Sequence, residues 1–258
     1  MKDDVYMISF SGGRSSAYMT DRLLRELPAS QVVVCFANTG KEDPKTLDFV
    51  DECDRHWGGV VHWLEYDRTE GIRVVTYGSA SRHGEPFAAM IDKRGYVPNV
   101  FWRFCTHDLK VRVIKRFMIQ QRYRDWVNVL GIRYDEPARW AKVRGIGEKE
   151  GWDTWLPLVD WKVTKPAVLD FWRKMPFDLQ LAPFMGNCDL CFLKGRNRWK
   201  RILTEQPEIA DWWVEQEKKV GGTFRKGVSV ADFLYQIRQA PTLFDYEDPD
   251  VVCFCNGD

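Results

Sequence analysis

The chain has 258 residues, of which 45% are hydrophobic and 29% are charged. This composition is typical of a folded globular protein and excludes a low-complexity chain. A formal net charge of +1 argues against an overall polyanion-binding surface, so any contact with nucleic acid is expected to come from a local patch.

The first predicted elements are a strand, a glycine loop and a helix. The N-terminal segment MKDDVYMISF carries acidic residues beside an apolar run that is too short for a signal peptide or a membrane span. We therefore expect a cytoplasmic protein without membrane association. The apolar run at residues 5–10 ends at the loop SGGRSS. Apolar residues then recur at helical spacing from Met19 until Pro28 stops them.

A second unit of the same kind follows. Residues 31–37 are mostly β-branched or otherwise apolar, as in a strand that is covered on both faces, and the letters NTG close it as a turn. A helix predicted from Pro44 onwards separates this strand from the apolar run at residues 60–66. The order strand, helix, strand, helix, strand predicts a parallel sheet with right-handed crossovers.

The middle of the chain is less regular. Residues 69–102 mix glycine, proline and charge without sustained periodicity, which predicts irregular structure over the sheet edge and suggests a mobile lid. A helix is predicted at residues 107–121 and a further strand at residues 126–132. Beyond this strand the chain is rich in aromatic residues, and we predict helices at residues 165–174, 198–205 and 208–220.

These elements together predict an α/β fold, namely a doubly wound, parallel, Rossmann-like sheet with a helical C-terminal extension. We divide the chain into an α/β domain at residues 1–160 and an extension at residues 161–258, which carries the CxxC and the terminal cysteines. The oligomeric state stays open, with a homodimer as one option.

The loop SGGRSS has the position and composition of a phosphate-binding loop. Its small residues let backbone N–H groups approach phosphate oxygens at the positive end of a helix dipole. Serine hydroxyls and the Arg14 guanidinium supply further donors. A glycine-rich turn that only lets strand and helix pack together is the alternative. The loop lacks the spacings of P-loop ATPases and of GxGxxG hydride-transfer enzymes, which disfavours both classes.

The loop resembles the SGGKDS-like loop of the PP-loop and phosphoadenosine phosphosulfate (PAPS) reductase family. Three further segments resemble motifs of that family and come in the same order: residues 37–50 (ANTGKEDPKTLDFV), 131–140 (GIRYDEPARW) and 157–161 (PLVDW). An ordered set of four is an improbable coincidence. The resemblance implies the adenine nucleotide alpha-hydrolase-like fold and an adenine nucleotide as cofactor, either ATP or PAPS or adenylyl sulfate.

The resemblance also implies residue roles. The residues implied to bind the nucleotide are Ser11, Gly12, Gly13, Arg14, Ser15, Ser16, Asn38, Thr39, Gly40, Gly131, Arg133 and Arg139. The loop would hold the phosphates or the sulfate, the NTG turn would line the adenosine, and the two later arginines suit bidentate contacts with anionic oxygens. Arg14, Ser15, Cys105 and Cys191 are the predicted catalytic residues. For any single arginine, a solvated surface charge is the alternative.

Seven cysteines in a chain without a secretion signal favour metal binding or redox chemistry over a disulfide framework. Cys188 and Cys191 form a CxxC, whose thiolates can converge on one metal, and Cys105 precedes a predicted helix. In the family, such a set resembles the ligands of a 4Fe–4S cluster, and we predict Cys255 as the fourth ligand. Alternatives are Cys253, an open iron, zinc with His107 as a ligand, or structural thiols without metal.

The segment KGRNRWKR, residues 194–201, follows the CxxC directly. A solvated helix face is the common explanation for such a run. The functional alternative is a phosphate track for a nucleic acid, with Trp199 available for base stacking.

Three functions fit these observations. The first is an adenylating enzyme that cleaves ATP between the α and β phosphates and transfers sulfur to tRNA or DNA, with Arg14 in place of the loop's usual lysine. The resemblance implies a cysteine desulfurase as its partner. The second is a thioredoxin-dependent reductase of PAPS or adenylyl sulfate, which needs a mobile thiol such as Cys253 or Cys255. The third is a non-catalytic nucleotide-binding accessory protein.

Overall fold

The computed structural model describes residues 4–144 and 153–239. Their strands form one sheet in the order β4-β3-β2-β1-β5-β6. The strands are β1 Tyr6–Ser9, β2 Val32–Asn38, β3 Val61–Glu65, β4 Arg73–Val75, β5 Val127–Leu130 and β6 Asp153–Trp155. All neighbouring strands are parallel except β3 and β4, which are antiparallel. The predicted α/β fold with a sheet dominated by parallel strands is thus confirmed.

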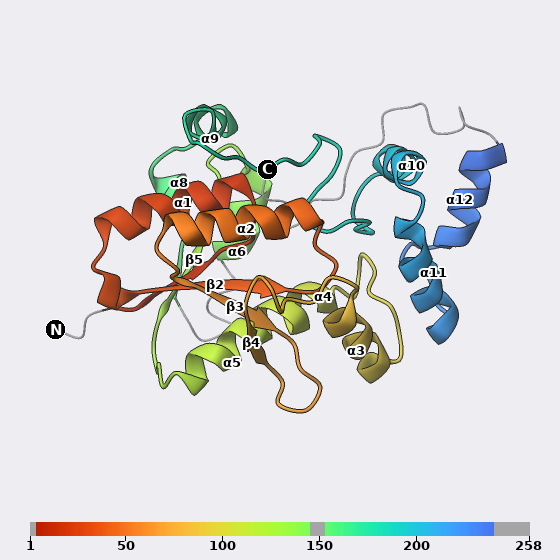
Figure 1. Ribbon diagram of the computed structural model, residues 1–258, viewed down its shortest axis with the longest axis horizontal. Helices are drawn as coiled ribbons and strands as arrows, with labels where there is room; N and C mark the ends of the chain where they lie inside the picture. The colour runs from red at the N-terminus through yellow and green to blue at the C-terminus, as the bar shows by residue number, and fades with distance from the viewer. Residues whose placement is uncertain (1–3, 145–152, 240–258) are drawn as a thin grey trace.

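Helices cover both faces of the sheet, as Figure 1 shows. One face carries α1 Arg14–Glu26, α2 Pro44–His56, α8 Pro157–Asp160 and α9 Lys165–Trp172. The other carries α3 Glu85–Arg94 and a helical run made of α4 Phe104–Thr106, the π-helical turn η2 His107–Val111 and α5 Arg112–Gln120. Each face buries its own apolar cluster, because alternate strand residues point to opposite sides. Helices thus cover both faces of the sheet, as in a doubly wound α/β fold.

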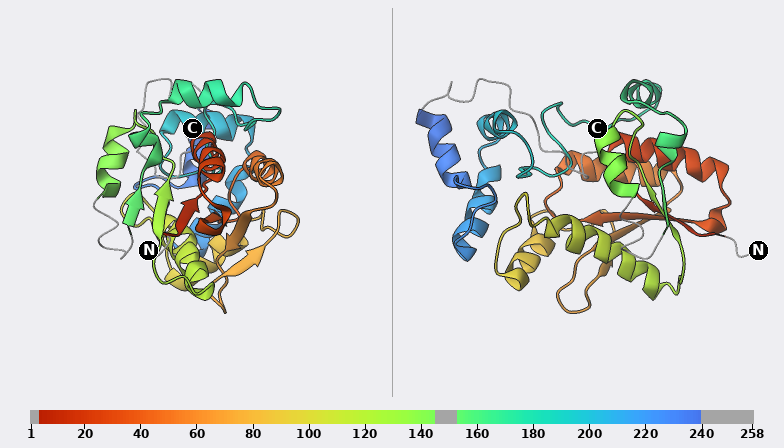
Figure 2. Two further views of the ribbon diagram at one scale, coloured as in Figure 1. Left: turned by 90° about the vertical axis from the view of Figure 1, so that its left-hand side faces the viewer. Right: turned by 180° about the vertical axis from the view of Figure 1, so that it is seen from behind.

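The remaining helices are α6 Pro137–Arg144, the short 3-10 turn η1 Ala29–Gln31, and α10 Arg196–Glu205, α11 Ile209–Val220 and α12 Val230–Gln239. The last three form a group at one end of the sheet, away from the N-terminus (Figures 1 and 2). The predicted helical C-terminal region is thus present. The division into two domains after residue 160 stays a prediction. Helix α9 follows that position, and it packs against α1 of the α/β part through an edge-on contact of Phe171 with Tyr18.

The prediction of irregular structure at residues 69–102 was wrong in two places. β4 adds an antiparallel strand to the sheet edge, and α3 packs under the sheet. Both elements are weak signals in the sequence. β4 has three residues, two of which are exposed, and α3 is only ten residues long. Within the described ranges, no helix combines the length and the apolar character that crossing a membrane requires.

The chain order produces a switch point between β1 and β5. From β1 the chain crosses through α1 to β2 on one side, whereas β5 lies on the other side of β1. The loops that follow β1 and β5 therefore lie at the carboxyl ends of two neighbouring strands whose connections run in opposite directions. In open α/β sheets, ligands bind at this position.

Candidate functional site

The loop after β1 is held tight by its own serines. The Ser16 hydroxyl donates to the carbonyl of Gly13 over 3.0 Å and accepts from the Ser11 amide over 3.2 Å. Gly12 has φ +77°, and a Cβ there would lie 2.7 Å from Cγ2 of Thr46 on α2. Gly13 begins α1 without a side-chain cap. Because Gly13 has no side chain that could cap the helix, the N-terminus of α1 at the switch point suits an anion.

The loop after β5 meets this first turn. Gly131 lies so close that a Cβ there would stand 2.7 Å from Cα of Ser16. Nη1 of Arg133 donates to the Ser15 hydroxyl over 2.9 Å, and Nε of Arg133 donates to Asp135 over 3.0 Å. Arg133 is only 7% exposed. The loop after β5 therefore places the buried guanidinium of Arg133 beside the SGG loop after β1.

Arg139 belongs to the same group. It is buried and pairs with the carboxylate of Glu136, whose second oxygen accepts the backbone N–H of Arg133 over 3.0 Å. Glu136 thus orients both predicted anion-binding arginines.

The NTG turn after β2 is fixed by buried hydrogen bonds. The Asn38 amide donates to Glu65 over 2.7 Å and to the carbonyl of Ser81 over 2.8 Å, and its oxygen accepts from the Gly40 amide. The hydroxyl and the amide of Thr39 both donate to Glu42 over 2.8 Å. The turn stands one strand away from the SGG loop, at the same edge of the sheet.

The CxxC segment lies against the SGG loop and against the residues that follow the NTG turn. The amide of Asp43 donates to the carbonyl of Asn187 over 2.7 Å, and Cys188 pairs with Glu42 as an antiparallel bridge. The side-chain amide of Asn187 donates to the carbonyl of Ser11 over 2.7 Å. A chain segment from the C-terminal part therefore connects the CxxC directly to the predicted phosphate loop.

The sequence profile of the phosphoadenosine phosphosulfate reductase domain matches residues 5–175, the part of the chain that builds this site. The chain belongs to the PAPS reductase family. The family is part of the PP-loop, or adenine nucleotide alpha-hydrolase-like, superfamily, and its members bind adenine nucleotides of the PAPS or ATP type. The match covers the sheet, α1, α2 and α9 and ends before the CxxC.

Two relatives are themselves uncharacterized. An uncharacterized nin region protein of Escherichia phage lambda is 30% identical over 208 residues, which cover 75% of this chain and 68% of the phage protein. An uncharacterized protein of Methanocaldococcus jannaschii is 23% identical over 212 residues, which cover 80% of this chain and 40% of that protein. The chain therefore spans less than half of this second relative.

Arg14, at the position of the lysine in the SGGKDS-like loops of the PAPS reductase family, is already engaged. Its guanidinium forms a bidentate pair with Asp178, with distances of 2.7 and 2.9 Å, and also donates to the carbonyl of Leu179. The predicted contact of Arg14 with a phosphate would require this pair to open. Arg133 is also paired, with Asp135 and Glu136, but its Nη1 in addition reaches the Ser15 hydroxyl of the loop.

Buried charges surround the CxxC, and sequence reasoning missed them. Lys41 pairs with Asp189 over 2.6 Å, and the Lys194 ammonium donates to the carbonyl of Asp189 over 2.9 Å. Burial raises the pKa of the Asp189 carboxyl, and the Lys41 ammonium opposes this shift. Lys110 pairs with Glu42 over 3.2 Å. Buried charges are costly and concentrate at functional sites. The sequence did offer one signal for these buried charges, because the segment GNCDLCFLK places polar and charged residues among apolar ones.

The described residues do not fit the predicted metal cluster. Cys105 and Cys191 pack against the same apolar cluster, and they and Cys188 are all partly exposed. Within residues 4–144 and 153–239, however, no three cysteine, histidine or carboxylate side chains converge as metal ligands. Neither the 4Fe–4S cluster nor zinc with His107 has support there. Cys253 and Cys255 lie outside the described residues.

The stacking role considered for Trp199 was wrong. Its side chain is fully buried, packs edge-on against Phe233, and donates its indole N–H to the carbonyl of Cys191 over 2.9 Å. The tryptophan therefore anchors the chain after the CxxC, and no face of its ring is available to a base. Cys35 and Cys53 are also buried, and burial raises the pKa of both thiols, as expected for packing residues.

Proposed function

We propose that the protein cleaves ATP between the α and β phosphates, adenylates an acceptor on a nucleic acid, and replaces the adenylyl group with sulfur. The hydrogen bond from Asn187 to Ser11 carries this proposal. It holds the residue that precedes the CxxC against the loop that suits a nucleotide's phosphates.

In the first step, an oxygen of the acceptor attacks the α-phosphorus of ATP, the bond to the bridging oxygen breaks, and pyrophosphate leaves. The uncapped amides at the start of α1 would bind the phosphates. Arg133, oriented by Glu136 and by the Ser15 hydroxyl, would stabilise the charge that develops on the leaving pyrophosphate. Because its donors are fixed before the reaction, little reorganisation is required.

In the second step, a persulfide on Cys191, supplied by a cysteine desulfurase, attacks the adenylated carbon, and AMP leaves. The Cys188 thiol then attacks Cys191, which frees the sulfurated product and leaves a disulfide between the two cysteines. A dithiol protein of the thioredoxin class would reduce this disulfide. Cys105 packs against the same apolar cluster as Cys191, and its catalytic role stays a prediction. No step passes through a metal.

The test measures pyrophosphate release from ATP in the presence of a persulfide donor, with bulk tRNA or DNA as the acceptor. We expect acceptor-dependent release that Arg133→Ala lowers by about a hundredfold, the effect of removing one preorganised donor. Cys191→Ser should leave release intact and abolish sulfur incorporation.

Two results would reject the proposal. Thioredoxin-dependent sulfite release from PAPS would show the reductase instead. Nucleotide binding without turnover by either assay would show the accessory protein.

A further inference from the structure

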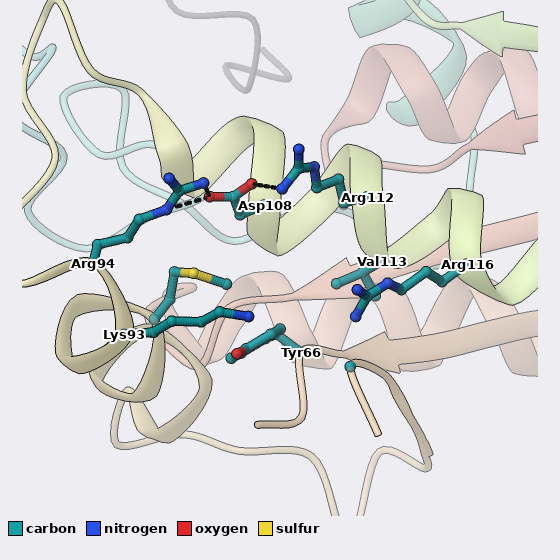
Figure 3. Close-up of a pocket in the computed structure, with 9 residues that line it drawn as sticks. Tyr66, Lys93, Arg94, Asp108, Arg112, Val113 and Arg116 are labelled. Carbon is teal, nitrogen blue, oxygen red and sulfur yellow. Dashed lines mark hydrogen bonds and ion pairs between the residues drawn. The ribbon is translucent and has the colours of Figure 1, made fainter. Parts of the chain in front are cut away.

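A second cluster of cationic side chains lies away from the proposed nucleotide site. It is a small pocket between the residues that follow β3, the last turn of α3 and the helical run of η2 and α5 (Figure 3). These elements cover the face of the sheet opposite α1 and α2. The pocket shares no residue with the SGG loop, the turn after β5 or the CxxC segment.

Four cationic side chains line this pocket, against one carboxylate. They are Lys93, Arg94, Arg112 and Arg116. The carboxylate of Asp108 pairs with Arg94, whose Nε lies 3.0 Å from Oδ2, and with Arg112, whose Nη1 lies 3.2 Å from Oδ1. Lys93 and Arg116 have no carboxylate partner within the described ranges of the chain. Lys93 and Arg116 are solvent-exposed, and with them the pocket has an excess of positive charge that no carboxylate of the described residues contacts.

Tyr66, which lines the pocket, has a buried hydroxyl without a partner. Tyr66 is 5% exposed, and its Oη has no hydrogen-bond partner among the described residues. Figure 3 shows Tyr66 between Lys93 and Arg116, and the Lys93 ammonium lies 5.7 Å from the centre of its ring. A buried, unpaired hydroxyl is unfavourable unless an acceptor satisfies it. Beside two unneutralised cations, the acceptor that fits is an anion.

The pocket is shaped in advance for a small group. Gly71 has φ +84°, and a Cβ there would lie 1.6 Å from Nη1 of Arg116. The guanidinium thus packs onto the bare backbone of the loop before β4. The cavity measures about 40 Å³, room for about three water molecules. This space fits a tetrahedral oxyanion.

We propose that this pocket binds a phosphate or sulfate group, either as the free ion or as the end of a small molecule. The Tyr66 hydroxyl donates to one oxygen, and Lys93 and Arg116 neutralise the charge from two sides. Arg94 and Arg112, held by Asp108, complete the positive rim. The site is additional to the nucleotide crevice and independent of it.

Titration calorimetry of the full chain with inorganic phosphate and with sulfate tests this proposal. The variant Lys93→Ala/Arg116→Ala removes both unneutralised cations, and Tyr66→Phe removes one hydroxyl while it keeps the ring. Lys226→Ala, an exposed lysine of another loop, removes one positive charge as the matched control. Arg133→Ala reports on the nucleotide crevice. Far-UV circular dichroism of each variant shows whether the fold is intact.

We expect phosphate or sulfate affinity to fall about tenfold or more in the double variant and several-fold in Tyr66→Phe, as for lost hydrogen bonds to a charged group. Lys226→Ala and Arg133→Ala should retain it. A tighter response to phosphate esters than to the free ions would identify a small molecule's terminal group.

Equal affinity in the wild type and the double variant would overturn the proposal, as would an absence of binding to the wild type. So would a loss in Arg133→Ala alone, since the anion would then occupy the crevice. A double variant that loses only oligonucleotide binding would assign the rim to nucleic acid and reject the oxyanion site. Failure of ATP to bind would contradict the proposed function and leave this test unaffected.

Discussion

Gly131, in the loop after β5, lies in close contact with the backbone of Ser16, in the first turn of α1. A Cβ at position 131 would lie 2.7 Å from Cα, 3.0 Å from N and 3.0 Å from Cβ of Ser16. Contacts this short with backbone atoms cannot be relieved by rotating a side chain. The close approach fixes the position of the loop after β5 relative to the loop that is proposed to bind the phosphates.

The substitution Gly131→Ala should therefore separate the two loops. We expect it to lower the free energy of unfolding by about 1–3 kcal/mol, as overpacking does, and to lower ATP affinity at least about tenfold. Urea denaturation and calorimetry measure the two effects. Gly78→Ala is the matched control, because a Cβ there meets no atom within 4 Å and its φ is not positive. Unchanged ATP affinity in Gly131→Ala would place the nucleotide elsewhere.

The link between Asn187 and Ser11 gives a second prediction. Asn187→Ala removes the amide that donates to the loop carbonyl, so the free energy of unfolding should fall by about 1 kcal/mol. The CxxC segment should also loosen, and the Cys188 thiol should react faster with an alkylating reagent. Gln180→Ala serves as the control, because it removes an exposed amide that donates to the carbonyl of Asp178. Equal alkylation rates in all three proteins would refute the link.

The sequence predicted those parts of the fold that are encoded locally. The long apolar runs gave β1, β2, β3 and β5, and the helical spacing after SGGRSS gave α1. The order of the motifs also anticipated that the loops after β1, β2 and β5 share one edge of the sheet. β4 was missed because two of its three residues are exposed, which leaves no pattern to detect.

The contacts of the CxxC could not be predicted in the same way. They depend on the pairing of Cys188 with Glu42 and of Asn187 with Ser11, between residues more than a hundred positions apart. No local preference encodes such a pairing. Arg14 shows the same limit, since its position suggested a phosphate contact, whereas its partner Asp178 becomes visible only in the fold.

Arg14 and Asp178 supply a third prediction. Their side chains are 20% and 34% exposed, so a double-mutant cycle of Arg14→Ala and Asp178→Ala should give a coupling energy of about 0.5–1 kcal/mol. If Arg14 acts by holding the start of α1 in place, the two variants will lower ATP affinity by similar factors. A much larger loss in Arg14→Ala than in Asp178→Ala would instead indicate that Arg14 contacts the phosphates directly.

The buried pair of Lys41 and Asp189 predicts a pH-dependent stability. Burial raises the pKa of Asp189 above its ordinary value of 3.8. The folded state therefore binds this proton more tightly than the unfolded state. The resulting contribution to the free energy of unfolding is fully present below pH 3.8 and is lost as the pH rises through the folded-state pKa. Lys41→Met removes the ammonium that opposes this shift, and the pKa will rise further. Breaking a buried pair in this way should cost about 3–5 kcal/mol at about pH 8 and less at about pH 5.

Urea denaturation at both pH values measures this difference. In Lys41→Met/Asp189→Asn the added pH dependence should vanish, because no buried carboxyl remains to be ionised at position 189. Lys226→Met, which removes an exposed ammonium, should match the wild type at both pH values. A loss of stability in Lys41→Met that is equal at the two pH values would mean that Asp189 stays ionised without its partner. The Lys194 ammonium, which also lowers the pKa of Asp189, would then be sufficient to hold the charge.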